Sequence, residues 1–392
     1  MPSPPQEQGP DDAYRSLAFH APDVPAHVCV LWPDSASARA CPRGDMELAY
    51  DGTIGRLTNT AFDARCIEYA EGYENSLSFS EFFQGYLDGL ARDLAERHDL
   101  SGKRVIEIGS GDGEFISSIC QLSGAEGIGY EPSWAEGRDT QLADGRVQIV
   151  RGLFPPQQGA APQAALVVCR QVLEHIEKPE PFLDAVRAAT APGSTVVFEV
   201  PNARDTLNRC SWFDLIYEHV HVFTAGSLAR QLAKAGFCVT RAEETYSGQF
   251  VLVEATVPES GAGSVPPEFE NLRTLEDEVT SFAEEWPKRR QAWIDELDQL
   301  GSAGKRISIW GTGARGINFL NLADPEGHIQ GAVDLNPRKH GRYVAGSGQC
   351  VQPPDWLKTF QPDLVIVMNP NYEDEIRTAL TELGLNPEVR LA

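Results

Sequence analysis

The chain has 392 residues, of which 42% are hydrophobic and 23% charged, and its formal net charge is −24. This length is enough for two or three domains with cores of their own. The excess of acidic residues argues against nucleic acid as a partner, because phosphate binding needs a basic surface. The eight cysteines contain no Cys-x-x-Cys pair, so we expect neither a metal site nor a disulfide framework.

The first residues are rich in Pro, Gln and Asp, and we expect residues 1–27 to be disordered. Residues 28–78 are punctuated by Gly and Pro, and they predict an irregular lead-in that includes a lid. The chain contains no apolar run near the roughly 20 residues of a membrane-spanning helix, and its opening lacks the apolar stretch of a signal peptide. These features predict a soluble, cytoplasmic protein without a membrane partner.

Residues 79–258 show the clearest pattern. A helix begins near Phe79, with Ser80 as its N-cap and apolar residues at helical spacing. Strands then alternate with helices of about ten residues, which is typical of parallel pairing with right-handed crossovers. The sequence therefore predicts a doubly wound α/β domain over these residues.

Residues 259–304 begin with a Gly/Pro/Ser-rich stretch and continue into a helical pattern, which predicts a linker and a long helix. Pro287 should kink or divide that helix. A second alternation of strands and helices follows. It predicts a further Rossmann-like domain over residues 305–392.

A glycine cluster, Gly109-Ser110-Gly111-Asp112-Gly113, follows the strand residues Val105 to Ile108 and opens a helix. Glycines let a backbone turn tightly and approach a ligand, and the free N–H groups of the helix start face it. The next strand ends in Glu131, at the distance expected for a carboxylate that accepts hydrogen bonds from a ribose. A later strand runs into Arg170-Gln171-Val172-Leu173-Glu174-His175.

Together these features resemble the class I S-adenosylmethionine (SAM) methyltransferases. The resemblance implies that SAM is the cofactor and that several residues contact it. Glu107 would act at the methionine end, the glycines would approach the cofactor, Glu131 would hold the ribose, and Gln171 would lie near the methyl donor. Phe154 would cover the adenine or belong to the core, and Tyr73 would form a lid or simply pack. The cofactor-binding candidates are Glu107, Gly109, Gly111, Gly113, Glu131, Phe154, Gln171 and Tyr73.

A narrower resemblance rests on Trp212-Phe213-Asp214-Leu215-Ile216-Tyr217-Glu218-His219-Val220-His221 and on the glycine loop after Trp310. These segments look like the sugar C-methyltransferases, which also carry a C-terminal Rossmann-like domain. Two departures stand out. Cys29, Cys41 and Cys66 lack the paired spacing of that family's zinc module, and its Tyr-His-Glu-His run is shortened here.

Carbon methylation needs a base beside a carbonyl, and a histidine with an ordinary pKa of about 6.5 is suited to this role. An extended run over residues 216–222 would place Tyr217, His219 and His221 on one face. His219 is the first candidate for the base and His221 the second. Tyr217 would donate to an enolate oxygen, and Glu218 would orient an imidazole or bind a substrate hydroxyl. His175 would act as a further catalytic residue or brace a loop.

The second glycine cluster contains Gly311, Gly313 and Gly316 in the G-x-G-x-x-G pattern, with Asp334 after the next strand. By itself this pattern predicts binding of NAD. The same loop is also suited to the diphosphate or ribose of a nucleotide-linked substrate, or it is only a structural turn. We favour the substrate site, with Gly311, Gly313, Arg315 and Asp334 as its residues.

The leading hypothesis is thus a SAM-dependent C-methyltransferase that acts on a nucleotide-activated keto-deoxysugar or a related small metabolite of a biosynthetic pathway. The alternatives are an O- or N-methyltransferase of small natural products and a non-catalytic SAM-binding partner subunit.

Overall fold

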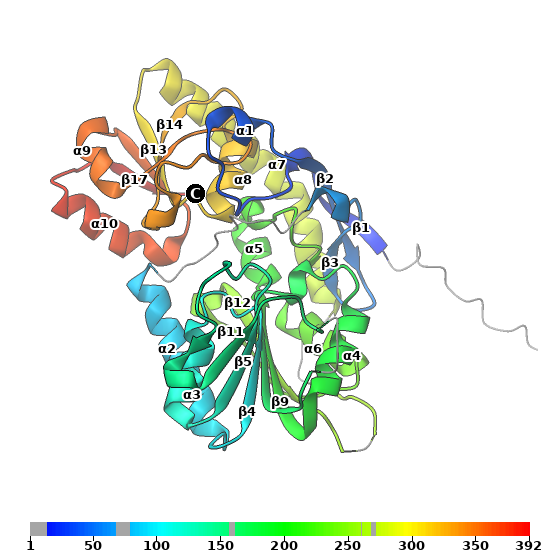
Figure 1. The fold of residues 1–392 in the computed structure, drawn as a ribbon. Helices are drawn as coiled ribbons and strands as arrows, with labels where there is room; N and C mark the ends of the chain where they lie inside the picture. The colour runs from blue at the N-terminus through cyan, green and yellow to red at the C-terminus, as the bar shows by residue number, and fades with distance from the viewer. Residues whose placement is uncertain (1–13, 68–78, 157–160, 260, 268–271) are drawn as a thin grey trace, which may run out of the picture.

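The computed structural model describes residues 14–67, 79–156, 161–259, 261–267 and 272–392 (Figure 1). These residues build three sheets. In the part of the chain that the structure describes, none of the helices has the length and apolar character needed to span a bilayer.

The first sheet is four-stranded and antiparallel, in the order β1-β2-β3-β10. Its elements, with one short helix, are β1 (Tyr14–Pro25), α1 (Ser35–Arg39), β2 (Arg43–Asp51), β3 (Arg56–Asn59) and β10 (His221–Val222). The prediction of disorder is therefore wrong for residues 14–27, and the prediction of an irregular lead-in is wrong for the strands that follow. The physical reason is that β1 buries Phe19, whose ring lies 4.6 Å from that of Trp286, far along the chain.

The central sheet has eight strands in the order β11-β12-β9-β8-β4-β5-β7-β6. Its strands are β4 (Arg104–Ile108), β5 (Glu126–Tyr130), β6 (Gln141–Leu142), β7 (Val147–Val150), β8 (Ala164–Arg170), β9 (Thr190–Pro201), β11 (Cys238–Thr245) and β12 (Phe250–Thr256). The five strands β4, β5, β7, β8 and β9 pair in parallel, which confirms the doubly wound α/β fold.

Two edges of this sheet differ from the purely parallel pattern. Strand β12 is antiparallel to β9 and forms a hairpin with β11, a strand that we did not expect. Only the short turn η6 (Tyr246–Gly248) joins the two strands, and such a turn permits antiparallel pairing alone. Strand β6 is likewise antiparallel to β7.

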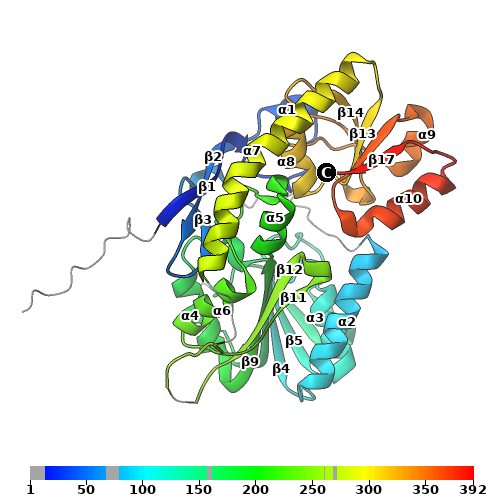
Figure 2. The same cartoon turned by 180° about the vertical axis from the view of Figure 1, so that it is seen from behind.

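Helices cover both faces of the central sheet (Figures 1 and 2). On one face lie α2 (Glu81–Arg97) and α3 (Glu114–Ser123), and on the other lie α4 (Pro179–Ala189) and α6 (Ala225–Lys234), while α5 (Ala203–Arg209) follows β9. Helix α2 begins after Ser80, whose hydroxyl accepts a hydrogen bond from Phe83 N, so the predicted N-cap is confirmed.

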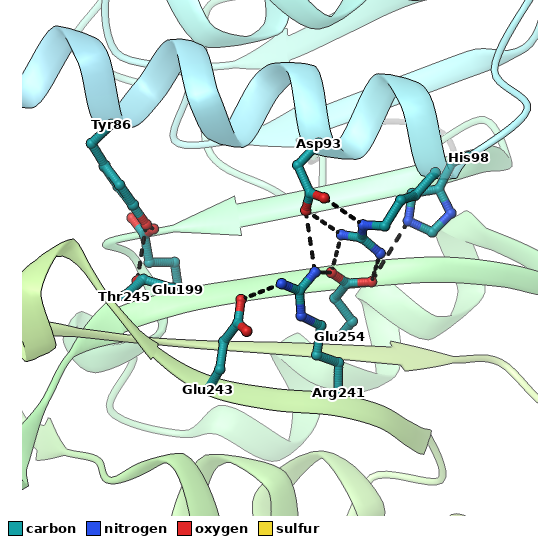
Figure 3. A network of polar contacts seen from close by, with 9 residues as sticks. Tyr86, Asp93, His98, Glu199, Arg241, Glu243, Thr245 and Glu254 are labelled. Carbon is teal, nitrogen blue, oxygen red and sulfur yellow. Dashed lines mark hydrogen bonds and ion pairs between the residues drawn. The ribbon is translucent and has the colours of Figure 1, made fainter.

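Charged residues fasten α2 to the antiparallel edge of the sheet (Figure 3). The guanidinium of Arg97 donates to both Asp93 and Glu254, at 2.7 and 2.9 Å. Arg241 on β11 donates to the same Asp93 at 3.2 Å and pairs with Glu243 at 2.7 Å. The network thus joins α2 to the hairpin of β11 and β12 at the edge of the sheet.

Helix α7 (Leu272–Ser302) connects the central sheet to the third sheet (Figure 2). It continues through Pro287, so the division considered there does not occur. Val279, Phe282 and Leu297 of this helix are buried, and Trp286 and Trp293 are partly buried. The helix packs on β1 and on the first helix of the C-terminal domain within one hydrophobic core.

The C-terminal sheet is five-stranded and parallel, in the order β15-β14-β13-β16-β17, which confirms a second Rossmann-like unit. Its elements are β13 (Ile307–Trp310), α8 (Ala314–Ala323), β14 (Ile329–Val333), β15 (Val351–Gln352), α9 (Leu357–Phe360), β16 (Leu364–Val367), α10 (Glu373–Glu382) and β17 (Glu388–Leu391). Short 3-10 turns elsewhere are η2 (Ala64–Cys66), η3 (Ala143–Gly145), η7 (Pro337–Lys339), η8 (Pro354–Trp356) and η9 (Pro370–Tyr372).

The carboxyl ends of the strands of the central sheet face those of the C-terminal sheet. The hydroxyls of Tyr246 and Tyr372 lie 2.6 Å apart, and the side-chain amides of Gln249 and Asn369 exchange hydrogen bonds of 2.8 and 3.0 Å. Because both glycine loops leave these carboxyl ends, the fold brings the two predicted ligand loops together between the two sheets.

Candidate functional site

The first glycine loop joins β4 to α3. Gly109 and Gly111 have φ values of +72° and +52°, in the left-handed region that favours glycine. A Cβ atom at Gly109 would overlap the Cγ2 methyl of Val172, whereas no described atom lies within 4 Å of the Cβ position at Gly111. Gly113, at φ +75°, caps α3. The loop is thus closely packed at Gly109 and open at Gly111, where a ligand can approach the backbone.

Glu131 stands at the end of β5 and faces this loop. Its carboxylate accepts hydrogen bonds from Gly111 N at 2.8 Å and from Ser133 N and Oγ at 2.9 and 2.6 Å. A carboxylate has about four lone-pair positions, so these bonds leave capacity for a hydroxyl. The ribose role stays a prediction.

Two polar groups beside the loop are buried without a hydrogen-bond partner among the described residues. They are the hydroxyl of Ser110 and the indole N–H of Trp134. Buried polar groups normally have hydrogen-bond partners, so the unpaired hydroxyl and indole N–H are suited to a polar ligand such as SAM.

Acidic side chains are buried under the loop. Glu107 is 3% exposed and accepts from Ile116 N at 3.2 Å, and burial raises the pKa of Glu107 to about 8. Glu199 is fully buried, pairs with Arg170 at 3.0 Å and accepts from Tyr86, whose oxygen also lies 3.0 Å from the hydroxyl oxygen of Thr245 (Figure 3). Carboxylates outnumber cations here, and this excess favours a positively charged ligand.

The remaining cofactor candidates lie in different settings. Gln171 stands at φ +54° after β8 and donates to Glu199 at 3.3 Å. Phe154 packs against Tyr130 and Phe182, with ring centroids 5.2 and 6.2 Å away, as the core alternative requires. Tyr73 lies outside the described residues.

The histidine run departs from the expected extended strand. Residues 217 and 218 form a turn in which His219 N donates to Ile216 O at 3.1 Å, and only His221–Val222 is a strand. The premise that Tyr217, His219 and His221 share one face is therefore wrong, because a turn sends successive side chains in different directions.

Three of these side chains contact the N-terminal sheet and its surroundings. The hydroxyl of Tyr217 accepts from Asp63 N at 2.8 Å, and Glu218 accepts from Val28 N at 2.8 Å. The two ring nitrogens of His221 lie 3.1 Å from Thr58 Oγ1 and 3.3 Å from Glu177 O. The contacts with Asp63, Val28 and Thr58 hold the turn against residues that precede the central domain.

His219 instead meets His175. Their ring centroids are 4.8 Å apart, at an interplanar angle of 82°. His175 Nδ1 lies 3.1 Å from the carbonyl of Glu218, and because a carbonyl only accepts, Nδ1 carries the proton and Nε2 keeps its lone pair. Burial lowers the pKa of His175 to about 4, and burial together with His175 holds the pKa of His219 well below its usual range. Both rings are neutral and able to accept a proton.

The second glycine loop is closed by its own acidic residue. Asp334 accepts from Thr312 N at 2.8 Å and Asn336 N at 2.9 Å, and its Oδ2 lies 3.0 Å from Lys339 Nζ. Although burial opposes it, the charge of Lys339 holds the pKa of Asp334 below its ordinary value. With the Thr312 hydroxyl at 2.9 Å, four donors fill the roughly four lone-pair positions of this carboxylate, one donor more than Glu131 has.

The three glycines of this loop differ in what requires a glycine at each position. Gly311 has φ +106°, and a Cβ atom at Gly316 would overlap the carbonyl oxygen of Gly311. No described atom lies within 4 Å of the Cβ position at Gly313. Two of the three glycines are thus required by packing or backbone conformation.

Two arginines of the C-terminal domain reach the central domain. Arg315 pairs with Asp214, whose pKa burial raises to about 6. Arg338 pairs at 3.0 Å with Asp112 of the first glycine loop, which Arg138 also contacts at 2.6 Å. The C-terminal domain therefore touches the predicted cofactor loop directly.

Comparison with known protein families gives two matched segments, one over the central sheet and one over α7 and the C-terminal sheet. Residues 79–242 match the family described as a methyltransferase domain, and residues 268–385 match the family described as a C-methyltransferase C-terminal domain. The chain carries a SAM-dependent methyltransferase domain. SAM is accordingly the cofactor of this domain.

Curated relatives resemble part of this methyltransferase. The mitochondrial ubiquinone biosynthesis O-methyltransferase of Schizosaccharomyces pombe is 26% identical over 117 residues, which are 28% of this chain and 42% of that protein. The ubiquinone biosynthesis O-methyltransferase of Bordetella parapertussis is 33% identical over 109 residues, or 26% of this chain and 44% of that protein. The chain spans about half the length of the curated relatives it matches.

Solved structures also resemble the methyltransferase. One is magnesium protoporphyrin IX methyltransferase from Synechocystis with bound SAH, at 15% identity and a TM-score of 0.36, covering 45% of this chain and 83% of that one.

Sequence reasoning missed two groups of residues in this methyltransferase. One is the Arg170–Glu199 pair with Tyr86, which lies under the loop. The other is Glu174, next to His175, which is 1% exposed. A charged residue inside an otherwise apolar strand end was the available signal for both groups.

Proposed function

We propose that this methyltransferase transfers the methyl group of SAM to a carbon atom of a nucleotide-linked keto-deoxysugar or a related small metabolite. The observation that carries the proposal is the match of residues 268–385 to a C-methyltransferase C-terminal domain. The pair of neutral imidazoles, His175 and His219, supports it, because carbon methylation needs a base.

In this proposal His219 is the general base. SAM, when bound, supplies an electrophilic methyl group on a sulfonium cation. The C–H electron pair of the acceptor forms the bond to the methyl carbon, and the S–CH3 electron pair stays on the sulfur of the product SAH. The acceptor's proton goes to a ring nitrogen of His219. His175 orients this ring, held in its own tautomer by the carbonyl of Glu218.

The buried carboxylates fit this redistribution of charge. The positive charge of the sulfonium disappears as an imidazolium forms, so the site holds a cation before and after transfer. Glu131 and Glu199, the latter paired with Arg170, provide a negative field for both states, whereas Glu107 is protonated near pH 7. We assign Tyr217, Glu218 and His221 to holding the turn that presents His219, because each is bonded to backbone or side-chain groups outside the site.

The C-terminal domain would bind the nucleotide end of the acceptor. Arg315 at the start of α8 and Arg338 in η7 lie beside the central domain, and a guanidinium pairs well with a diphosphate. An independent NAD site is less well supported, because Asp334 is occupied by Thr312 and Lys339.

Methyl transfer to oxygen is a second candidate, favoured by the names of the curated relatives, which are O-methyltransferases. The two reactions differ in the bond that the base breaks. A carbon acceptor exchanges its C–H proton with solvent, whereas an oxygen acceptor does not need to.

The test is hydrogen exchange in D2O with a nucleoside-diphosphate keto sugar, followed by transfer from methyl-labelled SAM. We expect deuterium beside the carbonyl and label on the same carbon. His219→Asn should lose both, and the exposed His20→Asn is the matched control. Label on oxygen without exchange would favour the second candidate. SAM binding with no transfer to either would support a non-catalytic partner subunit and overturn the proposal.

A further inference from the structure

Glu174 has an unusual setting for a carboxylate. It lies in the short turn η4 (Leu173–His175) at the end of β8, and it is 1% exposed. Neither of its carboxylate oxygens has a hydrogen-bond partner within the described ranges. One of these oxygens and one ring nitrogen each of His175 and His219 all lie within 4.8 Å of one another.

A buried carboxylate without partners is costly unless it carries a proton or faces a cation. The charged and titratable groups around it come from several elements. Cys169 and Arg170 lie on β8, Glu199 on β9, His175 on η4 and His219 on the turn. Arg170 is engaged by Glu199, so the group of this set that can become a cation beside Glu174 is an imidazole.

We propose that Glu174 is a positioning residue that stabilises the imidazolium formed on His219 when this ring takes the acceptor's proton. The inference rests on the proposed function and deepens it. His175 has its Nδ1–H on the carbonyl of Glu218, so its Nε2 offers only a lone pair and no positive charge. The carboxylate of Glu174 supplies the negative charge that the neutral His175 lacks.

The resting state agrees with this role. Burial raises the pKa of Glu174 to about 8, while the pKa of His219 is held well below its usual range, so the pair is neutral near pH 7. Ionised Glu174 is the form that stabilises an imidazolium. The rate of proton removal should therefore rise with pH as Glu174 loses its proton.

The experiment measures C–H exchange of the acceptor between pH 6 and 9.5 for the wild type, Glu174→Gln and Glu174→Asp. The wild-type rate should rise with an apparent pKa near 8. Glu174→Gln should be flat over this range and lower by about 10- to 100-fold at its upper end. Glu174→Asp should keep a rise, because it keeps the charge. Glu180→Gln, an exposed change on α4, is the matched control.

A second measurement separates this role from a structural one. Glu174→Gln keeps the shape and the neutral state that Glu174 has near pH 7 but cannot ionise, so the melting temperature should stay level at that pH, although the rate falls. A lower melting temperature with an unchanged pH profile would overturn the inference, and so would a wild-type profile without the rise.

Two further outcomes are distinguishable. If a divalent metal copurifies at one equivalent and is lost in Glu174→Gln, the three side chains bind a cation and the inference falls. If the wild type shows neither exchange nor transfer at any pH, the proposed function itself falls, and the inference falls with it.

Discussion

Replacing Gly111 by alanine separates the stability of the first glycine loop from its ability to bind SAM. Gly111 has φ +52°, where an L-residue costs about 1–2 kcal/mol. The Cβ position is open, with no described atom within 4 Å, so no steric term adds to this cost. The melting temperature should therefore fall by only about 2–4 °C per kcal/mol for a domain of this size.

The effect on SAM should be larger. The new methyl group would occupy the space through which the cofactor approaches the backbone, and we expect SAM affinity to drop by at least about 10-fold, which is 1.4 kcal/mol. Gly109→Ala is the matched variant. It shares the positive φ but adds the overlap with Val172, worth roughly a further 1–3 kcal/mol of stability.

Titration calorimetry with SAM and thermal melts of both variants test this reasoning. The Gly111 variant should be nearly as stable as the wild type but bind weakly, whereas the Gly109 variant should lose stability first. Wild-type SAM affinity in Gly111→Ala would show that the cofactor does not approach the loop there.

Two other changes test packing and charge. Gly316→Ala would place a methyl group against the carbonyl of Gly311 and should lower stability by about 3 kcal/mol or more, whereas Gly313→Ala, at φ −80° in open space, should change it by less than about 1 kcal/mol; urea denaturation of the pair measures this difference. Although burial opposes it, the neighbouring His98 ring, 3.6 Å away, and hydrogen bonds from Arg97 hold the pKa of Glu254 at about 2, below its ordinary 4.5. A lowered folded-state pKa gives stability that is complete above pH 4.5 and is lost as the pH falls toward 2. Glu254→Gln should therefore be less stable than the wild type at pH 6 and lose less between pH 4.5 and 2.5, and equal slopes in denaturation curves would contradict this.

The sequence was informative where local pattern and packing agree. The two parallel sheets follow from strands and helices that alternate at regular spacing, and the glycines after Ile108 and Trp310 lie after strands as expected. The hairpin of β11 and β12 was not predicted because the sequence pattern indicated only β12, whereas the mostly polar residues of β11 did not indicate a strand. Only the short turn at Tyr246 reveals their direction.

The N-terminal sheet and the histidine turn were not predictable for a different reason. Phe19 becomes buried only because Trp286 arrives from more than 260 residues away, and composition alone gives no sign of this contact. The turn at Tyr217 likewise depends on Asp63 and Val28, whose backbone N–H groups donate to its side chains. Motifs identified which residue types gather at the site, but partners distant in sequence decide where each side chain points.

The fourth strand of the N-terminal sheet, β10, comes from inside the methyltransferase segment, and its two residues pair with Leu57 and Thr58. This interleaving limits how the gene can be cut. A fragment that starts at residue 79 would lack the neighbours of its own histidine turn, and a swap of the catalytic segment between relatives would carry one strand away from its sheet. Recombination between relatives keeps the N-terminal sheet intact only if residues 14–59 and the catalytic segment are exchanged together.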